Sequence, residues 1–528
     1  MPVGYWCPVL HAHLPYVRHP EYEDFLEEDW FFEALTETYV PLVIVLDGLL
    51  ADGVDYRLTM TLSPPLLSMM GDDLLRARYH RYLDRLVGLA EREIDRTRRQ
   101  DPRFTDLARI YLHDLTRIRR VFREQYGSDL VRAFRAHRDT GKLEIITCGA
   151  THGFLPLMGV PQAVRGQVQV AARHYRATLQ RDPAGIWLPE CGYMPGHEAY
   201  LREEGIRFGF LESHGLTEAH PRPSHGVLAP IMSPGGVAFF GRDMESSRQV
   251  WSAESGYPGD YDYREFYKDV GWELPLEALG DVLPDGLRKN VGIKYYRVTG
   301  KVGLGDKQPY DRPRALEKAA LHAGHFLENR QRQVQGHAGS MKQPPLVVSP
   351  YDAELFGHWW FEGPDFLNYL FRKMHFDQDV IEPITPSEFL ERHPYLEVAQ
   401  PPFSTWGAKG YAEVWLNPGN DWIYPHLDMA AERMVELARR FPSSGDLERR
   451  ALNQAARELL LAQASDWAFI MKTGTTVEYA KKRTRDHIAR FTYLYRALVG
   501  EVMLEEPIVR EFEDRDNIFP DIDYRIYT

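Results

Sequence analysis

The sequence predicts an α/β fold in which a parallel sheet, either closed as a barrel or open, is covered by helices. Seven short apolar runs, each followed at once by polar residues, lie at residues 5–10, 56–62, 143–147, 186–188, 206–211, 237–240 and 346–348. Helical segments separate these runs, and strands buried on both faces are typical of parallel sheets. The length of 528 residues fits a (β/α) barrel with one further domain.

Composition limits the class of protein. At 44% hydrophobic and 26% charged residues the chain is typical of soluble globular proteins, and its net charge of -13 argues against binding nucleic acid. Three cysteines cannot form a disulfide scaffold, so we expect a reducing cytoplasm. We expect neither a signal peptide nor a membrane span.

Between the second and third runs the pattern becomes helical. Residues 73–140 place apolar side chains at helical spacing among many Arg and Glu residues, which predicts long amphipathic helices inserted between early strands. Residues 329–345 are polar and contain glycine, so we expect a surface loop there. After about residue 395 the pattern is mostly helical, and residues 448–474 and 477–499 resemble two packed helices. We therefore predict a catalytic domain at 1–395 and a helical domain at 396–528.

Two carboxylates follow predicted strands. Glu190 stands in Trp-Leu-Pro-Glu-Cys-Gly, and Asp352 stands in Ser-Pro-Tyr-Asp-Ala-Glu. In parallel α/β folds the chemistry lies at the carboxyl ends of strands, so both side chains can reach one rim. Two carboxylates facing each other are what glycoside chemistry needs. Glu354 competes with Asp352, because on an extended segment it would point the same way.

Histidines and cysteines lie at the same strand ends. His11 and His13 follow the first run and His152 follows the third. Such side chains can bind metal or contact a polar substrate, and we favour substrate contact because no carboxylate or cysteine pair accompanies them. Cys148 and Cys191 adjoin the site, but neither stands in the sequence context of a thiol enzyme.

Tryptophans could form a surface for a flat ligand. Trp406 and Trp415 lie nine residues apart in a glycine-rich segment, and Trp272 lies in another loop. Indoles stack on the apolar faces of sugars, although packing between domains would use the same residues.

Five segments together resemble glycoside hydrolase family 57, and within it the bacterial and archaeal 1,4-α-glucan branching enzymes. They are HAHLPY, LEIITCGATHG, WLPECGY, SPYDAELFGHWW and TWGAKGYAEVWLN, in the order found in the family. Segments near the C-terminus also match, so the resemblance covers nearly the whole chain.

This resemblance implies a (β/α)7 barrel, a distorted TIM-like barrel with an inserted helical region and a helical C-terminal domain that contributes to the substrate cleft. It implies that Glu190 is the nucleophile and that Asp352, rather than Glu354, is the acid/base. The substrate-binding residues that we carry over are His11, His13, His152, Arg264, Trp272, Trp360, Trp406, Trp415 and Asp466.

The resemblance further implies a retaining transfer of α-1,4-glucan chains to a 6-hydroxyl, as in glycogen biosynthesis. Retention requires carboxyl groups roughly 5–5.5 Å apart. We expect an amylose-, amylopectin- or glycogen-like substrate, no metal or organic cofactor, and a cytoplasmic monomer or homodimer.

One feature departs from the family. Related branching enzymes shield the intermediate with a loop tyrosine, but residues 201–256 contain no tyrosine. We expect residues 225–240 to form this loop. An α-amylase or a 4-α-glucanotransferase of the same family therefore stays an alternative, as do a metal-dependent hydrolase and a non-catalytic glycan-binding protein.

Overall fold

Seven parallel strands form the centre of the computed structural model, which describes residues 2–252, 256–284 and 286–528. They are β1 (Gly4–Ala12), β2 (Leu58–Leu62), β3 (Leu143–Ile146), β4 (Gly185–Ile186), β5 (Phe208–Leu211), β7 (Ala238–Gly241) and β8 (Leu346–Asp352). Each overlaps one of the seven predicted runs. Parallel ladders join them in the orders β8-β1-β2-β3 and β4-β5-β7.

Two sets of backbone hydrogen bonds connect these ladders into a ring. Trp187 N donates to Thr147 O at 2.9 Å, which joins β3 to β4. Asp243 N donates to Val348 O at 2.9 Å, which joins β7 to β8. The ring therefore has seven parallel members, and the predicted (β/α)7 architecture is confirmed.

Alternation along the strands decides which side chains face the inside of the ring. In β1, Tyr5, Cys7 and Val9 belong to one buried cluster, whereas Trp6 and Leu10 belong to another that includes the surrounding helices. Because strand side chains alternate with a period of two, His11 continues the inward row. Asp352 continues the inward row of β8 in the same way.

Three further strands were not predicted. They are β6 (Ile231–Met232), β9 (Ile381–Pro383) and β10 (Glu397–Val398). β6 pairs antiparallel with β7, and Val237 to Phe240 are completely buried. The expectation that residues 225–240 form a lid loop is therefore wrong, because apolar side chains fix this segment in the core.

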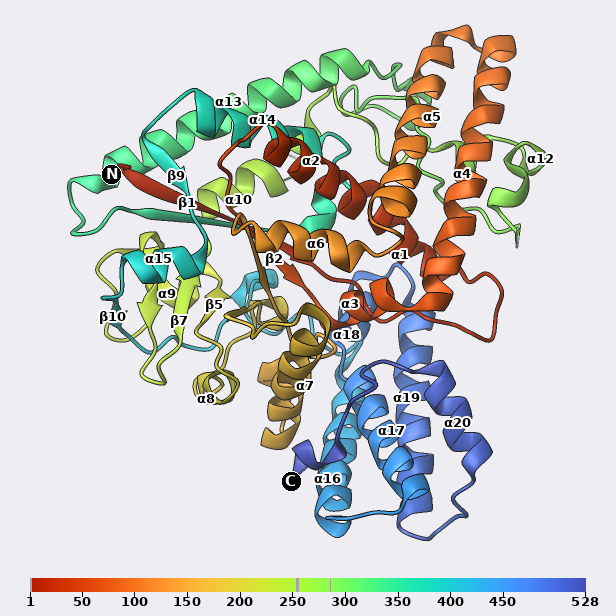
Figure 1. The fold of residues 1–528 in the computed structure, drawn as a ribbon, viewed down its shortest axis with the longest axis vertical. Coiled ribbons are helices and arrows are strands. Elements are labelled where there is room, and N and C mark those ends of the chain that lie inside the picture. The colour runs from red at the N-terminus through yellow and green to blue at the C-terminus, as the bar shows by residue number, and fades with distance from the viewer. Residues whose placement is uncertain (1, 253–255, 285) are drawn as a thin grey trace.

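The inserted helices between β2 and β3 are confirmed. α4 (Asp73–Gln100) and α5 (Thr105–Arg120) form a long antiparallel hairpin, at the upper right of Figure 1, and α6 (Leu130–Asp139) returns to the sheet. Asp72 caps α4 by accepting a hydrogen bond from Leu75 N at 2.9 Å. The remaining helices of the barrel region are α1 (Asp29–Ala34), α2 (Val40–Ala51), α3 (Pro64–Gly71), α7 (Pro161–Leu179), α8 (Glu198–Glu203), α9 (Ser213–Thr217), α10 (Met244–Trp251), α11 (Val270–Glu273), α12 (Leu276–Leu279), α14 (Gly363–Phe376) and α15 (Pro386–Arg392).

The surface loop predicted at 329–345 is mostly helix. α13 (Arg312–Ala338) continues to residue 338 and only residues 339–345 form the connection to β8. Arg330 is fully buried and its Nη1 lies 3.1 Å from Asp243 Oδ1, while Val334 is also buried. Tertiary packing of two side chains therefore stabilises a helix that the polar composition did not indicate.

The C-terminal part contains five helices among its described residues: α16 (Tyr424–Arg440), α17 (Asp446–Ala462), α18 (Ser465–Thr473), α19 (Val477–Leu498) and α20 (Glu506–Arg515). Apart from α18, which lies close to the barrel, they form the blue group at the lower right of Figure 1. Residues 399–423 contain only short turns, so the helical region begins later than predicted. The helix predicted over 448–474 is interrupted at Gln463 and Ala464, whereas α19 agrees with its prediction.

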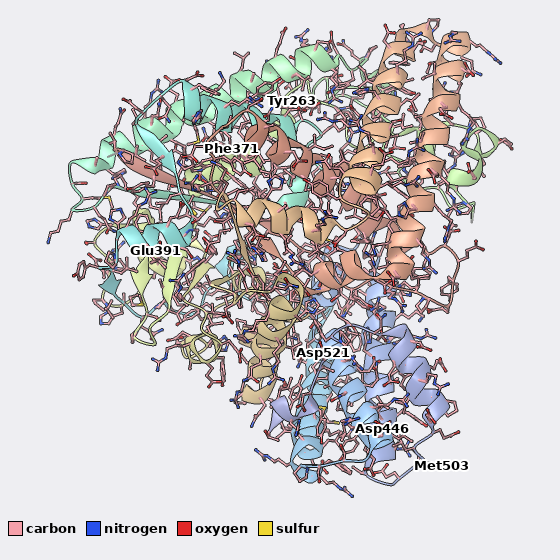
Figure 2. All side chains as sticks on the ribbon, viewed as in Figure 1. Tyr263, Phe371, Glu391, Asp446, Met503 and Asp521 are labelled. Atoms are coloured by element: carbon pink, nitrogen blue, oxygen red, sulfur yellow. The ribbon has the colours of Figure 1, made fainter. Side chains whose placement is uncertain are left out.

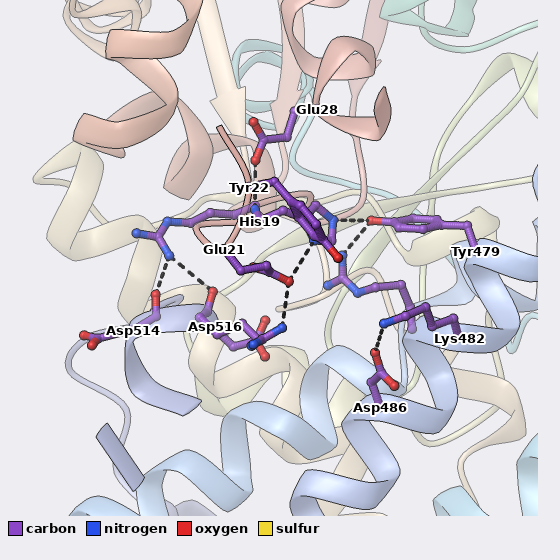
Figure 3. A network of polar contacts seen from close by, with 12 residues as sticks. His19, Glu21, Tyr22, Glu28, Tyr479, Lys482, Asp486, Asp514 and Asp516 are labelled. Atoms are coloured by element: carbon purple, nitrogen blue, oxygen red, sulfur yellow. Dashed lines mark hydrogen bonds and ion pairs between the residues drawn. The ribbon is translucent and has the colours of Figure 1, made fainter. Parts of the chain in front are cut away.

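A polar network joins the loop after β1 to these C-terminal helices (Figure 3). His19 Nε2 lies 2.8 Å from Tyr479 Oη of α19, and Arg515 of α20 forms an ion pair with Glu21 at 2.7 Å. His19 N also donates to Glu28 Oε1 at 2.8 Å. The segment after β1 is therefore held against the C-terminal helices α19 and α20.

The first long helical stretch is unusually apolar. Residues Leu26–Ala51 form 26 helical residues that are long and apolar enough to cross a membrane by length and composition, which we did not expect from the sequence. In the most apolar part of this stretch, 56% is buried inside the protein, as expected for a core helix. Figure 2 labels Tyr263 and Phe371, which belong to the same buried core in the upper part of the molecule. It also labels Met503, which is exposed at the lower edge of the molecule.

Candidate active site

Glu190 lies on a strained turn directly after β4. Its backbone is left-handed, with φ 60° and ψ 26°, and Cys191 follows with φ 50°. Such angles are uncommon outside glycine and asparagine and are often found at functional sites. A Cβ at Gly192 would lie 2.7 Å from Phe154 Cε2, so only glycine fits after this turn. The sequence Pro-Glu-Cys-Gly therefore presents the Glu190 carboxylate at the carboxyl end of the ring.

Two donors bind the Glu190 carboxylate. Trp406 Nε1 donates to Oε2 at 2.8 Å and Ser465 Oγ donates to Oε1 at 3.3 Å. The pKa of Glu190 is raised to about 8, chiefly by burial and also by the nearby Asp466 and Asp352 carboxylates, while the two hydrogen bonds oppose the shift. The carboxyl is therefore poised near neutral pH.

Asp352 ends β8 and is exposed to solvent at the same end of the ring. Burial by the surrounding protein raises its pKa to about 6, while the positive charges of Arg242 and His13 lower it. Solvent contact at Asp352 is consistent with a smaller shift than that of Glu190. Among the residues that the structure describes, none donates a hydrogen bond to this carboxyl, so it is available to a ligand.

Glu354, the rival of Asp352, is held by the protein. Its Oε1 accepts hydrogen bonds from Tyr39 Oη and from His13 N, the latter at 3.3 Å. Burial raises the pKa of Glu354 to about 8. With both donors on one oxygen, Glu354 is better placed to fix the segment after Asp352 than to act on a substrate.

Three histidines form a stack beside Glu190. The rings of His13 and His152 are stacked with centroids 3.8 Å apart and planes 10° apart, and His11 stacks on Trp187 at 4.9 Å. His11 Nε2 and His152 Nε2 are 3.0 Å apart. Burial lowers the pKa of His11 and of His152 well below the usual value, so both are neutral at pH 7.

Residues of α18 complete this cluster. Asp466 Oδ1 lies 3.1 Å from His13 Nε2, and Ser465 Oγ lies 2.8 Å from His152 Nδ1. Ser465 N also donates to His152 O at 3.0 Å. The interruption between α17 and α18 thus brings the start of α18 to the barrel, with its first two side chains against the histidines.

The same residues include groups that could hold a metal ion by proximity, namely His11, Cys148 and His152, and His13, His152 and Asp466. However, stacked parallel rings direct their in-plane lone pairs side by side rather than towards one point. His13 Nδ1 is also paired with Ser63 Oγ at 2.9 Å. The geometry favours a hydrogen-bonded network over a metal centre.

The other predicted residues lie in different surroundings. Arg264 is buried, with its guanidinium 3.8 Å from the ring centroid of Phe361 and bonded to Gly292 O at 3.1 Å. Trp272 is 54% exposed and bonds Asn290. Trp360 and Trp415 are each only 1% exposed, and Trp415 stacks on Phe154 at 4.4 Å. This burial argues against direct sugar contact by Trp360 and Trp415.

The prediction did not include three residues of the site. Arg242 follows β7 and lies 5.6 Å from the Trp406 ring, with Nη1 3.1 Å from Glu212 Oε2. Ser465 and Tyr39 contact Glu190 and Glu354. The polar Gly-Arg-Asp at the end of the sixth predicted run was a signal for Arg242. Nothing local in the sequence marked Ser465 or Tyr39.

A separate cavity of about 300 Å³ lies between the helical hairpin and α2, lined among others by Glu37, Tyr111, Arg264 and Phe361. It includes neither Glu190 nor Asp352, so Arg264 belongs to the wall of this cavity rather than to the carboxylate pair.

Two family models match the chain. The model described as glycosyl hydrolase family 57 matches residues 9–283, and the model described as 1,4-alpha-glucan branching enzyme, C-terminal, matches residues 426–527.

Individual relatives match over almost the full length. The 1,4-alpha-glucan branching enzyme TK1436 of Thermococcus kodakarensis is 34% identical over 98% of this chain and 77% of its own. Its crystal structure in complex with glucose and additives has a TM-score of 0.90, at 33% identity, covering 100% of this chain and 96% of that one. The alpha-amylase AmyC of Thermotoga maritima has a TM-score of 0.93 at 43% identity, covering 100% and 99%. The branching enzyme of Pyrococcus horikoshii has a TM-score of 0.89 at 33% identity, covering 99% and 97%.

Proposed function

Because the chain belongs to glycosyl hydrolase family 57, we propose that it is a 1,4-α-glucan branching enzyme, which cleaves an α-1,4-glucan and transfers the released chain to a 6-hydroxyl. The observation that carries the proposal is that Glu190 and Asp352 both border the histidine stack. His152 Nδ1 lies 3.9 Å from Glu190 Oε1, and His11, whose Nε2 lies 3.0 Å from His152 Nε2, pairs in register with Asp352 across β1 and β8. The match of residues 426–527 to the branching-enzyme C-terminal model supports the transferase over other activities of the family.

In the proposed mechanism, Glu190 attacks the anomeric carbon and Asp352 gives its proton to the departing glycosidic oxygen. A covalent glycosyl-enzyme results and the anomeric configuration is inverted once. The 6-hydroxyl of an acceptor glucan then attacks the same carbon, Asp352 takes the hydroxyl proton, and Glu190 leaves as carboxylate. Two inversions retain the α configuration, and the reaction as written involves neither a change of oxidation state nor a cofactor.

This mechanism needs Glu190 ionised and Asp352 protonated. In the singly protonated pair the proton lies mostly on Glu190, whose pKa of about 8 exceeds the value of about 6 for Asp352 even with the opposing hydrogen bonds from Trp406 and Ser465. We therefore assign the reaction to the minor form of this pair, in which Glu190 is ionised and Asp352 carries the proton. The two donors stabilise that form because they favour the anionic carboxylate.

The surrounding residues receive roles that fit their contacts. His11, His13 and His152, neutral or paired with Asp466, offer donors and acceptors to sugar hydroxyls. The half-buried Trp406 positions Glu190 and offers an aromatic face at the site. We propose an α-glucan substrate, and a cytoplasmic setting that fits the three free, buried cysteines.

The second candidate is an α-amylase acting by the same first step, with water in place of the acceptor hydroxyl. One observation favours it: a solved structure with 43% identity to this chain is named an alpha-amylase.

Incubation with amylose followed by linkage analysis tests the proposal. We expect new α-1,6 linkages that a debranching enzyme releases as short chains. Reducing ends that rise without any α-1,6 linkage would instead identify the hydrolase.

Replacement of the nucleophile tests the assignment of Glu190. Glu190→Gln should lower the branching rate by on the order of 10³-fold or more, with the thermal unfolding temperature at least that of wild type. Glu413→Gln, which changes an exposed glutamate seven residues after Trp406 in the sequence, is the matched control and should keep its activity. Branching near the wild-type rate in folded Glu190→Gln would contradict the assignment.

A further inference from the structure

An exposed group of aromatic side chains lies seven residues beyond Asp352. Trp359 is 52% exposed and its ring stacks on Phe266 with centroids 4.5 Å and planes 25° apart. Tyr267 is 68% exposed and packs edge-on against Phe266 at 5.1 Å. We call Phe266, Tyr267 and Trp359 the aromatic platform. Large aromatic side chains gathered at a surface are typical of a binding site.

Backbone hydrogen bonds fix the platform to the catalytic strand. Trp359 N donates to Glu354 O at 3.1 Å, and Gly357 N donates to Trp360 O at 2.8 Å, which closes a tight loop after β8. Glu354 is in turn held by Tyr39 and His13. The orientation of Trp359 is therefore tied to that of Asp352 by a short and rigid path.

One segment supports both ends of this path. η2 (Leu35–Tyr39) is a π-helix whose Tyr39 binds Glu354 and whose Glu37 Oε2 lies 2.7 Å from His358 Nδ1. A π-helical turn inside a helix is frequent at functional sites. At Gly357, which has φ 118°, a Cβ would overlap Glu37 O. This contact lets the loop carrying Trp359 lie directly on η2.

A buried cation supports the platform from beneath. Lys294 is only 1% exposed and its Nζ lies 4.2 Å from the Phe266 ring centroid. His358 packs edge-on against Phe266 at 5.4 Å and against Trp359 at 5.2 Å, so an imidazole lies beside the exposed rings. An exposed aromatic face beside an imidazole is suited to a pyranose, whose C–H face stacks on the rings.

We propose that the aromatic platform binds a glucosyl unit of the leaving or acceptor glucan, on the Asp352 side of the reacting bond. The inference rests on the proposed function, because an acid that protonates the leaving oxygen must lie on the leaving-group side of the bond. Because Trp359 follows Asp352 by seven residues and is tied to Glu354 by a backbone hydrogen bond, we place the platform on this side of the bond. Trp359 is then a determinant of acceptor length, and it contacts neither Glu190 nor the reacting carbon.

Equilibrium binding in an inactive background tests this role. Glu190→Gln is titrated with maltoheptaose, and the same titration is made with Trp359→Ala, Trp359→Phe and Trp251→Ala added to it. Trp251 is 63% exposed on α10 and serves as the matched control. We expect Trp359→Ala to weaken binding roughly three- to tenfold, Trp359→Phe to restore part of it, and Trp251→Ala to leave it unchanged.

Steady-state kinetics separate binding from a general structural effect. In otherwise wild-type enzyme, Trp359→Ala should lower kcat/KM on amylose by a similar factor but leave kcat/KM on an aryl α-maltoside unchanged, because the aryl leaving group carries no distal sugar. Equal binding by the Trp359→Ala and Trp251→Ala variants, or an equal loss on both substrates, would overturn the inference.

The two proposals can fail separately. Binding of maltoheptaose does not depend on which hydroxyl accepts the chain. If linkage analysis found no α-1,6 bonds but Trp359→Ala still weakened maltoheptaose binding, the platform would remain a leaving-group site in a hydrolase.

Discussion

Glu190 and Asp352 both have raised pKa values, so the pair loses its two protons in separate steps, near pH 6 and near pH 8. Only the singly protonated pair can both attack and donate. We therefore expect a bell-shaped dependence of kcat/KM on pH with its maximum near pH 7. The two limbs belong to the pair rather than to either residue.

Trp406→Phe should distort this profile. The substitution keeps an aromatic ring but removes the N–H that stabilises the Glu190 carboxylate, so the pKa of Glu190 rises further and ionisation requires a higher pH. Since a hydrogen bond to a charged group is worth about 1.5–3 kcal/mol, the form with Glu190 ionised and Asp352 protonated becomes rarer, so kcat should fall roughly tenfold or more, and the alkaline limb near pH 8 should move to higher pH. The measurement is kcat and kcat/KM from pH 5 to pH 9. An unshifted alkaline limb would show that Trp406 acts only through sugar contact.

Single residues also show how far the sequence could be interpreted. Glu190, Asp352 and the histidines were predictable because each follows an apolar run directly. Trp360 and Trp415 were not, since an indole that binds sugar and an indole that fills the core look alike without knowledge of their neighbours. Ser465 and Tyr39 acquire their roles only through contacts with residues 275 and 315 positions away.

The elements around the site depend on close approaches between backbones. The loop after β8 can rest on η2 only because residue 357 has no side chain and adopts φ 118°. This contact holds the segment that carries Glu354, His358 and Trp359.

Gly357→Ala should therefore destabilise the protein strongly. Its Cβ would overlap the carbonyl of Glu37 in addition to the strain of positive φ, so we expect a loss of about 3 kcal/mol or more in the free energy of unfolding. Gly500→Ala is the control, because Gly500 has φ 90° but no atom lies within 4 Å of the position that a Cβ would take there, and it should cost about 1 kcal/mol. Denaturant unfolding measures both, and equal losses would contradict the argument.

Whole elements were predicted unevenly, for a physical reason. The seven strands and the helices at 73–140 follow from hydrophobic periodicity, which is local. The helix through residues 329–338 is stabilised by the burial of Arg330 against Asp243, and the short strand β6 at residues 231–232 by its pairing with β7. Both are tertiary effects, which polar or glycine-rich composition cannot reveal.

At the scale of the whole molecule, the C-terminal region is attached to the barrel through buried polar groups as well as apolar ones. His174 of α7 lies 3.2 Å from Ser68 Oγ of α3 and packs edge-on against Phe519 at 5.3 Å. Burial lowers the pKa of His174 from 6.5 to about 4. The neutral imidazole thus joins two barrel helices to the C-terminal segment.

The protein should accordingly lose stability in acid. Because the folded-state pKa of His174 lies below its unfolded value, its contribution is complete above pH 6.5 and is lost as the pH falls towards 4. His174→Gln should reduce the slope of unfolding free energy against pH in this window by about one proton. Urea unfolding from pH 4 to pH 7 measures the slope. His113→Gln, at an exposed position of α5, should leave it unchanged, and an identical slope in both variants would contradict the assignment.

The meeting of Glu190 with Ser465 and Asp466 also has a consequence for biosynthesis. A ribosome releases the carboxylates of β4 and β8 well before α18, yet the histidine stack lacks its partners until α18 docks. A chain translated past β8 but not yet to α18 would thus carry both acidic groups on an unfinished site, and glucan remodelling would begin only once synthesis had nearly ended.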